Sequence, residues 1–71
     1  MRYLVVIERG ESSFGAYVPD LPGCIAAAES EAEVRKLIRE AIELHIESLR
    51  ESGQPVPTPS SSGTVIEVGA A

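Results

Sequence analysis

The residues best placed to do chemistry in this chain are carboxylates on one face of a predicted helix. Glutamates that recur at steps of three and four residues lie on one ridge of a helix, and here they are Glu40, Glu43, Glu47 and Glu51. Glutamates four residues apart repel each other, and those near the helix C-terminus meet the negative end of its dipole. This acidic ridge is therefore either a solvated face or a docking surface for a basic partner.

A thiol and an imidazole form a second candidate group. The chain has one cysteine, Cys24, and one histidine, His45, and a thiolate needs a nearby proton acceptor to react at neutral pH. Cys24 leaves a predicted turn toward an apolar strand and His45 shares the apolar stripe of the helix, so both are better explained as core residues. A single cysteine excludes an internal disulfide, and a single histidine leaves too few ligands for structural zinc.

The charge balance and the N-terminus narrow the possible partners. Eleven acidic and six basic residues give a formal net charge of -5, which repels the phosphate backbone of nucleic acids. The apolar run at residues 3–7 is too short for a signal-peptide core or a membrane span. We therefore expect a cytoplasmic protein that binds neither nucleic acid nor membranes directly.

Three strands are predicted before the helix. Residues 2–8 are typical of a central strand covered on both faces, because their middle positions are all apolar and rich in β-branched side chains. Residues 14–18 alternate between two faces and should form a hairpin with the first strand. Pro19 ends this second strand, and residues 21–24 carry proline and glycine where a type II turn needs them. Residues 25–28 then form a short edge strand.

Local signals mark both ends of the helix. Ser30 and Glu33 form a predicted capping box, so the helix should begin at Glu31. Gly53 supplies the left-handed residue that ends it. Between them, apolar or small residues recur at the three- and four-residue spacing of a helix packed on a sheet.

The remaining chain predicts a connection and a last strand. Residues 53–63 are rich in proline and serine and form an extended return segment, and residues 64–68 read as a final strand. The sequence thus predicts one domain, residues 1–71, of the α+β class with the element order β-β-β-α-β. We place the final strand parallel to the first, which gives the sheet order 3-2-1-4 and a right-handed crossover.

Three segments in this order resemble the HicB antitoxins and their solitary HicB-like relatives. They are Tyr17-Val18-Pro19-Asp20-Leu21-Pro22-Gly23-Cys24, Glu40-Ala41-Ile42 and Gly53-Gln54-Pro55-Val56-Pro57-Thr58-Pro59. The resemblance implies a truncated RNase-H-like fold, self-association to a dimer or higher oligomer, and neutralisation of a small basic HicA-type toxin that cleaves messenger RNA. Two features depart from the family pattern: Ala28-Glu29-Ser30 stands where a glycine, an acidic residue and a threonine are common, and we expect no DNA-binding domain.

An RNase-H-like fold prompts a search for carboxylates that converge to hold divalent metal ions. Glu8 and Asp20 lie at the ends of predicted strands, and the central strand positions are apolar. The fold would therefore serve as a scaffold, and we expect no metal, no cofactor and no enzymatic activity.

The sequence favours an antitoxin-like module that binds another protein. Its predicted contacts are the acidic ridge together with Pro55 and Pro57, while a set of motif residues has a structural role: Pro19, Asp20, Pro22, Gly23, Cys24, Ser30, Glu33 and Gly53. The alternative is an orphan regulatory or small-ligand-binding domain that has no toxin partner.

Overall fold

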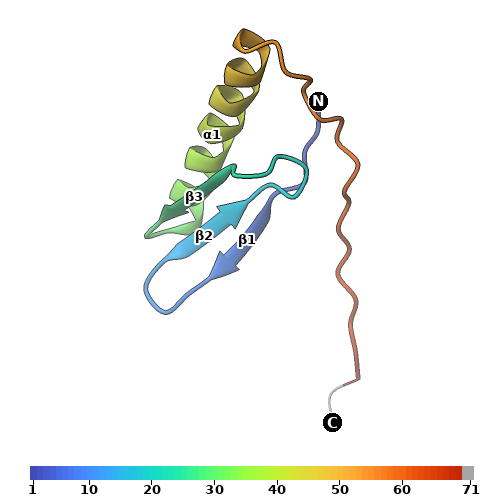
Figure 1. Ribbon diagram of the computed structural model, residues 1–71. Helices are drawn as coiled ribbons and strands as arrows, with labels where there is room; N and C mark the ends of the chain where they lie inside the picture. The colour runs from blue at the N-terminus through green and yellow to red at the C-terminus, as the bar shows by residue number, and fades with distance from the viewer. Residues whose placement is uncertain (70–71) are drawn as a thin grey trace.

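The computed structural model describes residues 1–69, so the last two residues of the predicted domain lie outside the described part. It contains three strands and then one helix (Figure 1), namely β1 (Val6–Arg9), β2 (Phe14–Tyr17), β3 (Ile25–Ala28) and α1 (Glu31–Glu51). The strands form one antiparallel sheet in the order β1-β2-β3. The predicted meander, the edge position of the third strand and the α+β class are confirmed.

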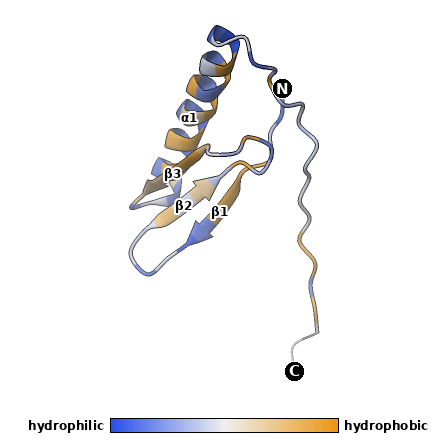
Figure 2. Ribbon diagram, viewed as in Figure 1, coloured by the Kyte–Doolittle hydropathy of each residue, from blue (hydrophilic) through white to orange (hydrophobic). Residues whose placement is uncertain are grey.

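The register of the sheet sorts the side chains onto two faces. Ala16 of β2 lies opposite Ile7 of β1 and Ala26 of β3, and all three belong to the core packed under α1. The helix lies over β2 and β3, where Val34 and Ile38 are its buried residues. Figure 2 shows hydrophobic and hydrophilic bands following one another along the turns of α1. The apolar side of this amphipathic helix covers one face of the sheet.

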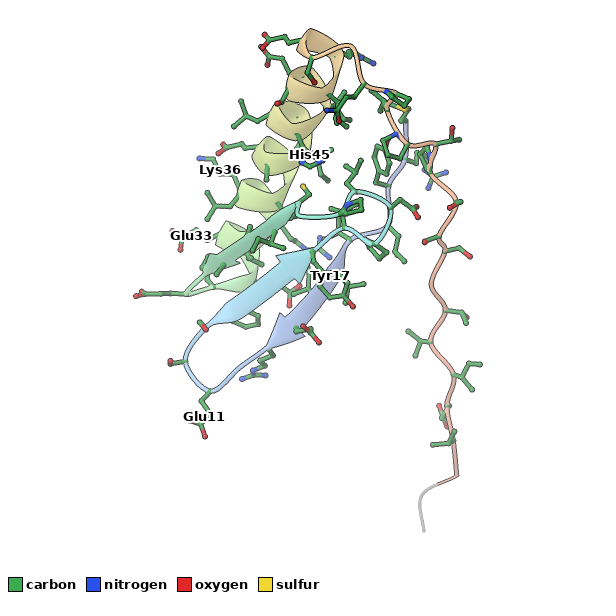
Figure 3. The ribbon with its side chains drawn as sticks, viewed as in Figure 1. Glu11, Tyr17, Glu33, Lys36 and His45 are labelled. Carbon is green, nitrogen blue, oxygen red and sulfur yellow. The ribbon has the colours of Figure 1, made fainter. Side chains whose placement is uncertain are left out.

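The other face of the sheet has no covering layer in the described residues. Val6, Tyr17 and Ile25 form a cross-strand row on it, one residue out of phase with the core row, and Tyr17 and Ile25 are exposed. Figure 3 shows the Tyr17 side chain projecting from β2. The sequence predicts that the first strand is covered on both faces. This prediction is wrong, because one face of the strand is uncovered among the described residues.

The helix begins and ends where predicted, but only one of the two bonds of the predicted capping box is formed among the described residues. The hydroxyl of Ser30 accepts a hydrogen bond from the Glu33 amide at 3.1 Å, although the reciprocal bond of the capping box is not formed among the described residues. At the other end, Gly53 has a φ of 71°, its amide donates to the Arg50 carbonyl and the Gln54 amide donates to the Leu49 carbonyl. These two bonds make a Schellman motif.

The predicted turn after β2 is also present. The Cys24 amide donates to the Leu21 carbonyl at 3.0 Å, and Gly23 has a φ of 85°, as a type II turn requires at this position. The Val18 amide donates in turn to the Cys24 carbonyl. Leu21 is fully buried by this loop, so the turn is built into the core.

Two predictions about the first and last strands are wrong. β1 spans Val6–Arg9 rather than residues 2–8, and it lies at an edge, because residues 64–68 form no strand. The β1–β2 ladder stops at the pair Val6 and Tyr17, and the amide of the next residue, Val18, donates to the Cys24 carbonyl on the β3 side. The order 3-2-1-4 therefore reduces to its first three strands.

Candidate protein-interaction site

A groove separates α1 from the N-terminal strand. Because the helix lies over β2 and β3, it leaves the inner face of β1 and the preceding residues partly uncovered. The groove has a volume of about 590 Å³, and its apolar lining comes from both sides: Met1, Tyr3, Val5 and Ile7 from the N-terminal segment and Ile38, Ile42 and Ile46 from α1. We call this feature the β1–α1 groove.

Charged residues of the helix border the same groove. Arg35, Arg39 and Glu43 line it, and all three are exposed. Arg35 also forms an i, i+4 ion pair with Glu31, at 3.5 Å between Nε and Oε2, which contributes little because both side chains are well exposed. The groove therefore combines an apolar floor with a mouth of mixed charge.

The acidic ridge is exposed along its whole length. A second, smaller depression of about 440 Å³ lies toward the C-terminal end of α1. It is lined by Glu43, Glu47 and Glu51 together with Met1, Ile46 and Arg50. Glu43 borders both depressions. The structure thus brings three of the four predicted glutamates to an apolar surface, whereas Glu40 lies outside both depressions.

The two predicted contact prolines differ in their surroundings. Pro55 is exposed just after the helix, but Pro57 is half-buried, and its carbonyl accepts a hydrogen bond from the Tyr3 hydroxyl. Pro57 therefore connects the return segment to the residues that precede β1. Among the motif residues, Pro19 and Pro22 are exposed in the loop after β2, and Glu33 is exposed at the helix start (Figure 3).

Asp20, in the loop after β2, makes a second set of contacts to the return segment. Its carboxylate accepts hydrogen bonds from the amides of Ser60 and Ser61, both at 2.9 Å, and from their hydroxyls. The amide bond from Ser61 and then that from Ser60 are the main causes that lower the pKa of Asp20 from 3.8 to about 2. The serine run had been interpreted only as linker, so sequence analysis missed both donors; the polar aspartate in an otherwise apolar turn was the available signal.

The thiol and the imidazole considered for catalysis are both at least partly buried. Cys24 is buried, and burial raises the pKa of its thiol, which disfavours the reactive thiolate. His45 is half-buried on α1. Within residues 1–69, no group of three or more histidine, cysteine or acidic residues could hold a metal ion, and no helix is long and apolar enough to cross a membrane.

The sequence model of the HicB-like antitoxins of bacterial toxin-antitoxin systems matches residues 3–68. The chain belongs to the HicB-like antitoxin family. The match includes the sheet, the helix, the return segment and the unpaired residues after it.

Relatives of this HicB-like chain occur in a phage, an archaeon and a cyanobacterium. A 14.9 kDa protein from the rep-hol intergenic region of Haemophilus phage HP1 is 35% identical over 57 residues, which are 80% of this chain but only 43% of the phage protein. A UPF0150 protein of Thermoplasma acidophilum is 36% identical and is covered over 84% of its length. A UPF0150 protein of Synechocystis is 41% identical, with 71% covered.

A solved structure agrees with this assignment. One chain of a HicA3 and HicB3 toxin-antitoxin complex superposes with a TM-score of 0.72 at 35% identity, over 84% of this chain and 70% of that chain. Membership of an antitoxin family favours a regulatory over an enzymatic role. In this HicB-like chain one face of the sheet is uncovered within residues 1–69, and the helix carries a row of exposed glutamates.

Proposed function

We propose that this HicB-like chain is a non-catalytic antitoxin module that acts in the cytoplasm. It binds a small basic HicA-type toxin directly and so prevents that toxin from cleaving messenger RNA. The observation that carries the proposal is the acidic ridge, because three of its glutamates border apolar depressions on the same helix. The likeness to a chain of a solved toxin-antitoxin complex supports it.

The surface beside the ridge has the composition of a protein interface. Leu44 is 67% exposed and stands four residues after Glu40 and three before Glu47, so it lies next to both on the helix surface. An exposed leucine flanked by acidic residues provides an apolar anchor inside a charged rim. The charges would accelerate encounter with a basic partner and exclude acidic ones.

The net charge of -5 argues against direct binding to nucleic acid, so we propose that the module acts on the toxin and not on its RNA target. We further propose that the domain, residues 1–71, has a truncated RNase-H-like fold and self-associates at least as a dimer. The uncovered row of Val6, Tyr17 and Ile25 and the free edge of β1 support self-association, since both are surfaces that soluble proteins usually cover.

The β1–α1 groove also favours a second candidate, an orphan regulatory or small-ligand-binding domain. Its volume of about 590 Å³ and its mainly apolar lining with a few charged groups are those of a small-molecule site. A ligand in this groove would contact Tyr3, Ile42 and Arg39. A bound metabolite that protects these residues, in a chain that has no effect on a toxin, would favour this candidate.

The decisive experiment is an RNA-cleavage assay with the purified chain and a purified HicA-type toxin. We expect cleavage to fall in proportion to the added chain and to stop near equimolar amounts. A variant with Glu43→Lys and Glu47→Lys should inhibit less at equal concentration, whereas Glu11→Lys with Glu29→Lys, an equal charge change elsewhere, should inhibit like the wild type. Undiminished cleavage at a large excess of wild-type chain would overturn the proposal.

A further inference from the structure

The C-terminal arm, residues 64–69, exposes more apolar surface than its length would suggest. Val65, Ile66 and Val68 are 97%, 74% and 78% exposed. Figure 2 shows this short hydrophobic stretch near the end of the extended chain, and Figure 1 shows the arm running clear of the sheet and the helix. Its β-branched composition is that of a strand, yet it pairs with none of the described residues.

The sheet has an unpaired strand edge that could accept the arm. β1 is bonded to β2 on one side, and its other edge pairs with none of residues 1–69. The β1–α1 groove adjoins this edge and is lined by Val5 and Ile7 below and Ile42 above. A strand added to the edge would satisfy free backbone groups and place every second side chain in the groove.

Contacts of the return segment determine where the arm begins. The Tyr3 hydroxyl bonds to Pro57, and the Asp20 carboxylate holds Ser60 and Ser61. A Cβ atom added to Gly63 would lie 3.4 Å from Cδ1 of Leu4, so the chain still touches the body there. The arm therefore leaves beside the residues that precede β1 and projects outward from a fixed point (Figure 1).

We propose that two copies of the chain exchange these arms: residues 64–68 of each copy add to the free edge of β1 in the other copy and fill its groove. This inference deepens the self-association in the proposed function and rests on it. The outer edge of β3 is also unpaired among residues 1–69, but no β3 residue lines either depression, so only the β1 edge combines free backbone groups with an apolar groove. Each copy thus offers one arm and one such edge, and a two-fold exchange pairs both arms and closes the assembly at two chains. It also removes an exposed strand edge that would otherwise invite aggregation.

The sequence of the arm indicates which side chains enter the groove. Successive residues of a strand face opposite sides, so Ile66 and Val68 share one face with Thr64, while Val65 and Glu67 share the other. Placing Ile66 and Val68 toward the groove buries two aliphatic side chains against its apolar floor. Glu67 then lies on the solvent-facing side of the sheet, where a charge is tolerated.

Sedimentation equilibrium on the full chain tests this arrangement. We expect a dimer at tens of micromolar, and a variant with Ile66→Asp and Val68→Asp should raise the dimer dissociation constant by about 100-fold or more. The matched control, Glu67→Lys, should leave it nearly unchanged. Because the arm is exposed and outside the core, unchanged circular dichroism of the variants will separate loss of assembly from misfolding. A monomeric wild type, or a dimer indifferent to the arm variant, overturns the proposal.

Disulfide trapping distinguishes exchange between chains from closure within one chain. A chain with Ile66→Cys is mixed with a chain carrying Val5→Cys or Ile7→Cys, all in a Cys24→Ala background whose folding is checked first. We expect a cross-linked pair of unequal chains, and none when Glu67→Cys replaces Ile66→Cys. In a single chain with both cysteines, an internal disulfide at monomer mass would overturn exchange.

The toxin assay separates the two proposals. If the arm variant is monomeric but still inhibits RNA cleavage, exchange stands independently of toxin binding. If the wild type is an exchanged dimer that fails to inhibit cleavage, the antitoxin proposal fails and the exchange remains. If the wild type is monomeric and inhibits cleavage, exchange alone is wrong.

Discussion

The carboxylate of Asp20 accepts hydrogen bonds from both the amide and the hydroxyl of Ser61, at 2.9 and 2.8 Å, across forty-one residues of sequence. This contact joins the loop after β2 to the return segment that follows the helix. Together with the bond from the Tyr3 hydroxyl to Pro57, it determines where the C-terminal arm leaves the body of the protein. Perturbing Asp20 should therefore affect both stability and the start of the arm.

The stabilisation that Asp20 gives through its bonds to Ser60 and Ser61 should depend on pH. The pKa of Asp20 is lowered from 3.8 to about 2 in the folded state, so its ionised form stabilises the fold above the unfolded pKa and this contribution is lost as the pH falls through about 2. Urea denaturation of the wild type and Asp20→Asn should thus differ at neutral pH and converge between about pH 4 and pH 2. Glu11→Gln, an exposed control, should follow the wild type. A difference that is constant across this range would contradict the ionic anchor.

The N-cap of α1 should have a measurable effect. Ser30→Ala removes the oxygen that accepts from the Glu33 amide, and we expect a loss of about 1 kcal/mol in the free energy of unfolding. Chemical denaturation with an unchanged slope gives this value from the shift in midpoint. Ser12→Ala, in the exposed hairpin loop, is the control. A midpoint equal to that of the control would show that Ser30 does not stabilise the helix.

The turn glycine after β2 should resist substitution. Gly23 has a φ of 85° and open space around it, so Gly23→Ala introduces backbone strain without a steric clash. We expect a cost of about 1–2 kcal/mol, measured by urea denaturation. Gly15→Ala is the matched control, because its surroundings are equally open and its φ is not positive. Equal stability of the two variants would argue against the predicted strain.

The acidic ridge should govern how fast a basic toxin associates. Glu43→Lys with Glu47→Lys should slow association and weaken its dependence on salt, whereas dissociation should change less if these charges lie at a solvated rim. Binding kinetics at several salt concentrations measure both rates, with Glu11→Lys and Glu29→Lys as the charge-matched control. Equal association rates for the two double variants at low salt would identify the ridge as ordinary solvated surface.

Features that depend on neighbouring residues could be predicted from the sequence. Ser30 caps the helix through the Glu33 amide three residues later, and Gly23 and Gly53 adopt positive φ where the turn and the helix end require it. The apolar stripe of α1 and the phase of β2 likewise follow from periodicity. Local geometry decides these features, so a short window of residues contains the necessary information.

Features that depend on distant residues were decided only by the tertiary structure. The sequence predicted residues 64–68 as a strand from their composition, and that prediction is wrong for the described chain because composition does not specify a neighbouring strand. Whether Tyr3 meets Pro57, whether Asp20 meets Ser61, and whether β1 lies inside the sheet or at its edge depend on how segments about forty to fifty residues apart are brought together. Periodicity reports the environment that a segment prefers, whereas its actual contacts depend on the competing contacts of every other segment, and a strand finds its edge only through such long-range competition.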